Sequence, residues 1–482
     1  MEKYYNKDTN TLSLPYYFNS KLEELPLDVK IIIFNNENTT FEKKQHKSIF
    51  NQSVDNLPSD ITHITFGCSF NKSVDNLPIN LTHLKFGYDF NQSVDNLPIN
   101  LTHLHFGQDF NQWVDNLPIN LIHLIFGGRF NQLIDNLPKN LTHLILNQNF
   151  DNKIDNLPNK LQYLIIDGDF NQPVNFLPSS ITHLYFYLLF NQPIDNLPIN
   201  LTHLVLDAHF NQNIDKLPSN LKYLKIHCTM MKHSFDYLPK NLTHLYLFET
   251  FNDHLNNLPQ NLEVLYLGSR LFNKTIDYLP LNLIKLYVYG RFNLPIDKLP
   301  NSLTHLSIGD KFNQSVDNLP NCLTHLSIGD KFNQSVDNLP INLTHLILGS
   351  EFNQSIDKLP NNLTHITLGI GFNQPINNLP KNLSKKTLHI YYDPNILNNI
   401  STDYEYLNIK FEYYHLFKEI IINNIPFSIK EIILTNHNNI KIFNKIPFNC
   451  MVYCKEYNYK EKNYYKKYFS YHKNKFILKK LN

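Results

Sequence analysis

Histidine returns once per repeated unit along this chain, at positions where imidazole could ligate a metal, move a proton or stack on a neighbouring ring. The twelve histidines of this series are His63, His83, His103, His123, His143, His183, His203, His244, His305, His325, His345 and His365. No carboxylate or thiol joins them at the spacing of a metal site, so metal binding is the least favoured of three interpretations. The regularity favours a structural stack of imidazoles, and a face that binds a protein partner is the other alternative.

A series of aspartates accompanies the histidines, each two residues before a Leu-Pro pair. Its members are Asp55, Asp75, Asp95, Asp115, Asp135, Asp155, Asp195, Asp215, Asp317, Asp337 and Asp357. Aspartate in such a context typically caps a turn by accepting a backbone N–H, which is what we expect here. Calcium binding is the alternative. It is disfavoured because each unit supplies one carboxylate and lacks the glycine-rich loops of calcium-binding β-rolls.

The sequence contains no motif of a known enzyme class. No GxGxxG, P-loop or HExxH pattern stands out, and Ser-His-Asp combinations arise by chance when His and Asp recur in every unit. The five cysteines are scattered, which is typical of a reducing compartment, and Cys450 and Cys454 form a C-x3-C without a second pair. We therefore expect a protein that is not an enzyme, with no cofactor, no metal and no small-molecule substrate.

The unit that positions these residues is a repeat of 20 residues, or 21 in two places, anchored on Leu-Pro. The seventeen pairs begin at Leu57, Leu77, Leu97, Leu117, Leu137, Leu157, Leu177, Leu197, Leu217, Leu238, Leu258, Leu279, Leu299, Leu319, Leu339, Leu359 and Leu379. A fixed period of this length indicates a solenoid, in which each coil buries its apolar face against its neighbours. The positions expected to point inward in the unit 77–96 are Leu77, Leu81, Leu84, Phe86, Phe90 and Val94.

Within each unit the pattern predicts one short strand and no helix. A proline in every unit and the β-favouring run LTHLKF exclude a helical window, so we expect a strand at 82–86, a turn and an extended or 3₁₀ return segment. Glycine follows the strand in many units, as at Gly87 and Gly107. We interpret this as a turn that needs positive φ.

The repeated unit resembles the FNIP repeat, a relative of the leucine-rich repeat, most fully in FNQPVNFLP from Phe170 and FNQPIDNLP from Phe190. The resemblance covers about residues 50–390. It implies a mainly β, curved, leucine-rich-repeat-like solenoid of 20- to 21-residue coils with one short parallel strand per coil. It also implies a protein typical of social amoebae and amoeba-infecting giant viruses, and no enzymatic activity. Asn91 lies two places later than the asparagine of the standard leucine-rich pattern, which leaves open whether it forms the usual asparagine ladder.

The repeat pattern sets the expected domain organisation. We expect an N-terminal degenerate coil or cap at 1–49, the FNIP-type solenoid at 50–390, degenerate repeats and a C-terminal cap at 391–454, and a basic Tyr- and Lys-rich tail at 455–482. The tail holds nine lysines and two glutamates. A loose tail or a final cap is the favoured interpretation, and binding of nucleic acid or an anionic membrane is the less favoured one.

The strand pattern also predicts an interaction surface. If residues 84 and 86 face the core, residues 83 and 85 face the opposite, concave side, where a uniform histidine column lies beside a column of varied residues. The candidate partner-binding residues on this face are His83, Lys85, His103, His105, His123, Tyr185, His203, Lys225, His244, Tyr246, Tyr266 and Tyr287.

Three functions are compatible with these patterns. The favoured one is a monomeric scaffold that binds an unidentified protein through the concave face. The second is a substrate receptor of a cullin-type ubiquitin ligase, because LEELPLDVKIIIF from Leu22 has an F-box-like opening. The third is a product of repeat expansion without a dedicated partner. A net charge of +1, no signal peptide and no stretch of about 20 apolar residues predict an intracellular, cytoplasmic protein.

Overall fold

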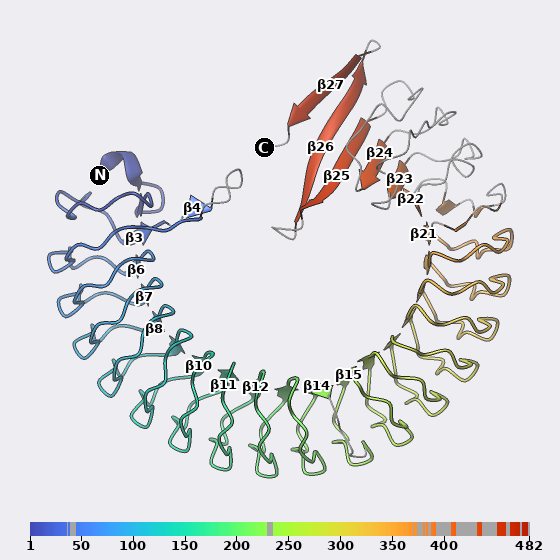
Figure 1. Cartoon of the computed structure of the whole chain (residues 1–482), viewed down its shortest axis with the longest axis horizontal. Coiled ribbons are helices and arrows are strands. Elements are labelled where there is room, and N and C mark those ends of the chain that lie inside the picture. The colour runs from blue at the N-terminus through green and yellow to red at the C-terminus, as the bar shows by residue number, and fades with distance from the viewer. Residues whose placement is uncertain are drawn as a thin grey trace. The chain divides into compact units, whose positions relative to one another are not determined.

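The computed structural model describes residues 1–35, 37–38, 45–228, 235–369, 371–372, 374, 379–380, 382–383, 387–391, 406–410, 431–435, 451–458, 463–472 and 475–480. Only the backbone is described at 37–38, 45–46, 228 and from residue 387 onward. The chain forms two compact units, Met1–Leu242 and Thr243–Asn482. Figure 1 shows that the coils of each unit follow a curve, with the strands on its inner side.

The first unit stacks parallel strands one coil apart. Its elements are η1 Glu2–Tyr4, β1 Tyr5–Asn6, β2 Thr11–Leu14, β3 Ile31–Phe34, β4 Glu37–Asn38, β5 Gln45–His46, β6 His63–Thr65, β7 His83–Lys85, β8 His103–His105, β9 His123–Ile125, β10 His143–Leu146, β11 Tyr163–Ile166, β12 His183–Phe186, β13 His203–Leu206 and β14 Tyr223–Cys228. From β6 to β14 every residue pairs with the residue 20 positions later. The degenerate N-terminal segment belongs to the same parallel β-ladder, because β3 pairs in parallel with both β2 and β6.

The second unit continues this plan and ends in antiparallel strands. Its elements are β15 His244–Glu249, β16 Val264–Ser269, β17 Lys285–Val288, β18 His305–Ile308, β19 His325–Ile328, β20 His345–Leu348, β21 His365–Leu368, β22 Thr387–Tyr391, β23 Tyr406–Lys410, β24 Glu431–Thr435, β25 Met451–Asn458, β26 Asn463–His472 and β27 Lys475–Lys480. Strands β15 to β25 are parallel, whereas β26 is antiparallel to both β25 and β27. Among the described residues, 3₁₀ conformation is found at Glu2–Tyr4 and at 382–383, and none of them is α-helical. The predicted β-solenoid with one parallel strand per coil is confirmed.

The core is the column of apolar residues that the repeat predicts. Leu84, Phe86 and Phe90 are at most 2% exposed, and the coils between Ile64 and Phe372 repeat this buried pattern wherever their side chains are described. The rings of Phe86 and Phe90 lie 3.6 Å apart within a coil, and Phe90 lies 6.0 Å from Phe110 in the next coil. Each coil therefore covers its phenylalanines with those of its neighbours, which is why a single coil cannot fold alone.

Asn91, whose role the sequence pattern leaves open, does belong to an asparagine ladder. The backbone N–H of Asn111 donates to Asn91 Oδ1 at 2.9 Å, and Gln112 Nε2 donates to the same oxygen at 3.1 Å. Equivalent bonds link Asn71 to Asn51 and Asn313 to Asn293. The side chain thus satisfies a backbone donor of the next coil that the parallel sheet does not reach.

Replacing Asn91 tests how much this ladder stabilises the fold. Asn91→Ala is expected to cost about 1–2 kcal/mol of unfolding free energy, because the N–H of Asn111 loses its acceptor. Asn91→Asp is the matched control, since Asp151 already accepts the N–H of Asn171 at 2.9 Å in the same role. Urea unfolding of both variants decides the matter, and equal destabilisation by Ala and Asp would contradict it.

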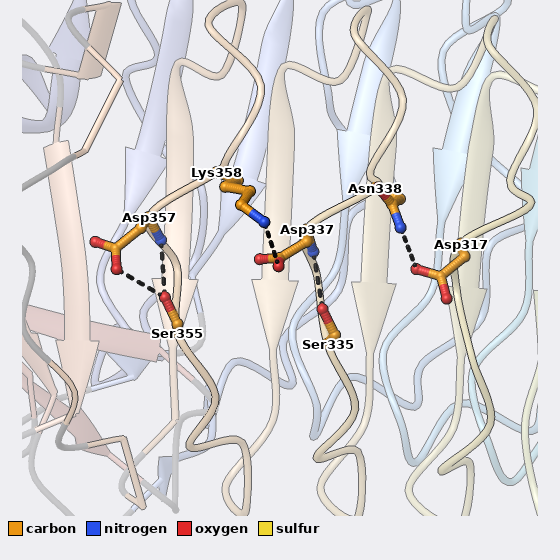
Figure 2. A network of polar contacts seen from close by, with 7 residues as sticks. All are labelled: Asp317, Ser335, Asp337, Asn338, Ser355, Asp357 and Lys358. Atoms are coloured by element: carbon orange, nitrogen blue, oxygen red, sulfur yellow. Dashed lines mark hydrogen bonds and ion pairs between the residues drawn. The ribbon is translucent and has the colours of Figure 1, made fainter.

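The aspartates do cap the return segment, but not in the way the sequence predicts. The N–H of Asp357 donates to Ser355 Oγ at 3.2 Å, and that hydroxyl donates back to Asp357 Oδ2 at 2.9 Å. Across coils, Asn338 Nδ2 donates to Asp317 Oδ1 at 3.1 Å and Lys358 Nζ lies 3.0 Å from Asp337 Oδ2 (Figure 2). The carboxylates therefore accept side-chain donors and not the expected backbone N–H.

The glycines after the strands also have a different role from the predicted one. Among the described glycines, positive φ is found at Gly168 and Gly290. Neither belongs to the glycine column, by which we mean the glycines at the position of Gly87 and Gly107 in each coil. At Gly107 the reason for glycine is close packing, because an added Cβ would lie 1.6 Å from the carbonyl oxygen of Gly87. The expectation of a positive-φ turn is therefore wrong for this column.

Candidate interaction surface on the strands

Each unit has a candidate site on its strands. We call it the strand face and define it as the residues that alternate with the buried ones, on β6–β14 in the first unit and on β15–β21 in the second. In β7, Leu84 is buried, His83 is half-buried and Lys85 is exposed. Other strands repeat this alternation, as in β12 and β18. The first column of the strand face starts at His63 and the second at Thr65.

The first column is a stack of rings. In the first unit the ring centroids of His63, His83, His103, His123, His143, Tyr163, His183 and His203 follow one another at 4.1–4.5 Å. In the second unit His305, His325, His345 and His365 stack at 4.1–4.2 Å. The interpretation of the histidines as a structural stack is therefore confirmed.

Hydrogen bonds with the preceding threonine hold most of these imidazoles in place. Thr82 Oγ1 lies 2.9 Å from His83 Nδ1 and donates to the carbonyl oxygen of Thr62 at 3.1 Å. A hydroxyl carries one hydrogen, so the geometry assigns the donated proton between Thr82 and His83 to Nδ1 and leaves Nε2 with its lone pair. Most histidines of the column repeat this Thr-His pair, as at Thr324 and His325.

Burial keeps the column uncharged near neutral pH. Burial, with a smaller effect from neighbouring imidazoles, lowers the pKa of His83 and His183 to about 4. Burial also lowers the pKa of His63, His103, His123, His143, His305 and His325. At these eight positions the histidine column is therefore a neutral polar surface and not a basic patch.

The second column forms part of two adjoining grooves in the first unit. One groove, of about 350 Å³, lies along the strands between His63 and Ile125. The other, of about 570 Å³, follows the turns after the strands, and both are lined by Thr65, Lys85 and His105. Burial and the charge of Lys85 lower the pKa of His105, so Lys85 supplies the cationic group at this junction.

In the second unit the second column is aromatic. The ring of Tyr266 lies 5.8 Å from Tyr246 and 5.6 Å from Tyr287. Tyr289 lies 5.4 Å from Tyr266, and its hydroxyl is 3.0 Å from Ser307 Oγ. Burial raises the pKa of Tyr246 and Tyr266, so both remain protonated donors at neutral pH. These four tyrosines, which we call the tyrosine cluster, are each half-buried.

The family model for the FNIP repeat matches this chain in twelve segments, most of which overlap, and together they cover more than half of it. They are 50–89, 70–96, 90–128, 113–149, 130–167, 150–188, 190–229, 272–311, 294–331, 312–351, 332–369 and 352–389. The chain belongs to the FNIP repeat family. A search of curated proteins found no match.

One solved structure supports a leucine-rich-repeat-like fold for the FNIP coils. CroV588, described as a novel circular LRR protein structure, is 32% identical over 90% of this chain and 76% of its own, with a TM-score of 0.68. YopM from Yersinia enterocolitica is 19% identical over 78% of this chain and 82% of its own, with a TM-score of 0.41. InlJ from Listeria monocytogenes is 13% identical over 79% and 84%, with a TM-score of 0.39. The first match confirms the leucine-rich-repeat-like fold.

The candidate residues predicted from the sequence all lie on the strand face of the FNIP coils, in two groups. The first unit holds His83, Lys85, His103, His105, His123, Tyr185, His203 and Lys225. The second unit holds His244, Tyr246, Tyr266 and Tyr287. Five residues of the first group line the groove along the strands: His83, Lys85, His103, His105 and His123.

The groove along the turns was missed by the sequence interpretation. Tyr88 is 43% exposed on its rim, with Lys47 Nζ 4.8 Å from the ring centroid, and Gln108 lies in the next coil. The signal was present, because the residue after the glycine changes from coil to coil just as the second column does. A turn identified from its residue types alone does not reveal that its side chains line a groove.

The described part of the FNIP chain lacks both a cluster of metal ligands and a membrane-spanning helix. It holds no group of three or more His, Cys, Asp or Glu residues that could bind a metal ion. Cys450 lies outside the described residues, and Cys454 is described in β25 by its backbone alone. No described helix has the length and apolar character needed to cross a membrane.

Proposed function

We propose that this FNIP-repeat chain is a non-enzymatic scaffold that binds a protein partner along its strand face. It is a repeat solenoid resembling leucine-rich-repeat proteins, which generally mediate protein interactions. The observation that carries the proposal is the contrast between columns. The core and the first column stay nearly constant, whereas the accessible second column changes from Lys85 and His105 to Tyr246 and Tyr266. Variation confined to one accessible column is expected of a surface fitted to a partner.

Within this surface the tyrosine cluster is the proposed anchor. Tyr246, Tyr266 and Tyr287 lie on adjacent strands, and their rings contact one another before any partner arrives. Binding a partner then restricts few additional rotamers of these tyrosine side chains, so the entropy cost is small. Aromatic residues of this kind dominate the binding energy of many protein interfaces.

A matched pair of tyrosine variants tests the anchor. The partner is first identified by affinity capture of the tagged chain from its native cells and then purified. Tyr266→Glu is expected to weaken its binding at least about thirtyfold, because a charge replaces a central aromatic contact. Tyr278→Glu is the control, since Tyr278 is 67% exposed on a return segment away from the strands. Titration calorimetry of both variants supplies the comparison.

Two outcomes would contradict the proposal. One is equal binding of the partner by the Tyr266 and Tyr278 variants, which would show that the interface does not lie on the strand face. The other is capture of cullin-ligase subunits bound through residues 22–35, which would support the ligase alternative. That alternative is second because Ile31–Phe34 forms β3, a strand paired with the coils on both sides.

A further inference from the structure

The strands that end the described chain carry a concentration of positive charge that the coils lack. Strands β25, β26 and β27 form an antiparallel sheet that continues from the parallel strand β24. Residues 455–482 hold nine lysines and two glutamates. The register of these strands shows how the lysines are distributed between the two faces of the sheet.

The core face can be followed from coil to coil through the pairing. It starts at Ile366 and Leu368, which are 1% and 0% exposed. The residues in register with them on the following strands are Leu388 and Ile390, Leu407 and Ile409, Ile432 and Leu434, and Val452 and Cys454. In the antiparallel strands, Val452 lies opposite Phe469, and Phe469 lies opposite Leu478. The core face of the final sheet therefore carries Val452, Phe469 and Leu478, but it also includes Glu456 and the opposed pair Lys467 and Lys480.

The opposite face, which we call the terminal open face, is aromatic and basic. Its paired positions form three successive rungs: Tyr453 with Tyr468, Lys455 with Lys466, and Tyr457 with Tyr464. Lys479 adds a further lysine opposite Tyr468, whereas Glu456 pairs with Tyr465 on the core face. Over the described residues of β25–β27 the terminal open face includes no carboxylate.

The pair of opposed lysines, Lys455 and Lys466, which we call the lysine rung, would be stabilised by an anionic ligand. Like charges directly opposite each other in an antiparallel pair destabilise the sheet, and no acidic residue shares the face of Lys455 and Lys466 to offset them. The rungs on both sides are aromatic and lie about 7 Å away along the strands. A phosphate backbone supplies the missing anions, and its bases supply flat partners for tyrosine.

We propose that the terminal open face binds single-stranded nucleic acid. Phosphates lie at the Lys455–Lys466 rung, and bases stack on the tyrosine rungs beside it. The alternation of basic and aromatic rungs favours this ligand over an acidic protein or an anionic membrane, because neither of those presents a flat ring at each step.

Binding of a labelled oligouridylate of about 20 nucleotides by the full-length chain tests the lysine rung. Fluorescence anisotropy is expected to show binding that weakens as salt rises, because phosphate contacts release counterions. Lys455→Glu with Lys466→Glu is expected to lower affinity about tenfold or more. The control makes the same charge change at Lys72 and Lys153, which are exposed in the first unit, and is expected to change affinity less than about twofold. Equal losses in the two double variants would overturn the proposal.

The tyrosine rung separates stacking from charge attraction. Tyr453→Ala with Tyr468→Ala is expected to lower affinity about tenfold, whereas the double Phe variant, which keeps both rings, is expected to bind like the unaltered chain. Circular dichroism of each variant confirms that the fold persists. Equal binding by the Ala and Phe variants would overturn the proposal. So would binding of phosphatidylserine vesicles that the oligonucleotide does not displace, which would indicate a membrane surface.

Discussion

Gly107→Ala is expected to destabilise the first unit by about 3 kcal/mol, at the upper end of overpacking effects. The new Cβ would lie 1.6 Å from the carbonyl oxygen and 2.4 Å from the carbonyl carbon of Gly87. Both are backbone atoms, so no rotamer change relieves the clash, and the two coils must separate. Separation would strain the bond from the N–H of Asp109 to the carbonyl of Tyr88, now 2.9 Å. Urea unfolding followed by circular dichroism measures the loss.

Gly128→Ala is the matched control for this substitution. Its added Cβ would meet Gln108 Nε2 at 2.1 Å and Gln148 Oε1 at 2.4 Å, which are the ends of two flexible side chains. Those side chains can rotate away at the cost of their mutual 3.0 Å hydrogen bond, so a loss below about 1 kcal/mol is expected. If both glycine variants unfold at the same urea concentration, close backbone packing is not the reason for glycine at position 107.

The melting temperature is expected to fall by on the order of 10 °C between pH 7 and pH 4.5. Burial lowers the pKa of His83 and His183 to about 4 in the folded chain, whereas an unfolded histidine titrates at 6.5. Between these values the unfolded chain binds protons that the folded column does not. Stability is therefore complete above pH 6.5, is lost as pH falls toward 4, and changes little from this source below 4. Each imidazole is half-exposed, so solvent screening reduces its share, but many act together.

Calorimetric scans at closely spaced pH values test this expectation. Tyr163 occupies the column between His143 and His183 with ring distances of 4.5 and 4.1 Å, so tyrosine fits the stack. His103→Tyr with His123→Tyr should therefore keep the fold and flatten the decline below pH 6.5. A melting temperature that stays constant from pH 8 to pH 5 would show that the histidine column does not control acid stability.

Much of the coil could be predicted from the sequence because the period makes positions equivalent. Alternation placed Leu84 inward and His83 outward, and a histidine in the same place in successive coils had to lie beside its counterpart. A period does not reveal which atoms of the neighbouring coil each residue meets. For that reason the partner of Asp357 and the reason for Gly107 were both predicted incorrectly, and the role of Asn91 stayed open.

The candidate surface was predictable in its position but not in its shape. Strand alternation identified the two columns, whereas the groove beside Tyr88 depends on how successive glycine turns pack, which no single coil contains. The end of the chain was harder still. Residues 455–482 carry no Leu-Pro anchor, so nothing in the period indicated that β26 and β27 would turn back as antiparallel strands.

The asparagine ladder has a consequence for how such a chain can change its length. Every bond of the ladder joins one coil to the next in the same way, from the N–H of Asn111 to Asn91 and from the N–H of Asn131 to Asn111. Removing or duplicating one complete coil therefore reconnects identical donors and acceptors, while a gain of two or three residues within a strand breaks the match for both neighbours. The segments 303–320 and 323–340 are identical, as duplication of one complete coil predicts. For this protein the coil, and not the residue, is the natural step of genetic change.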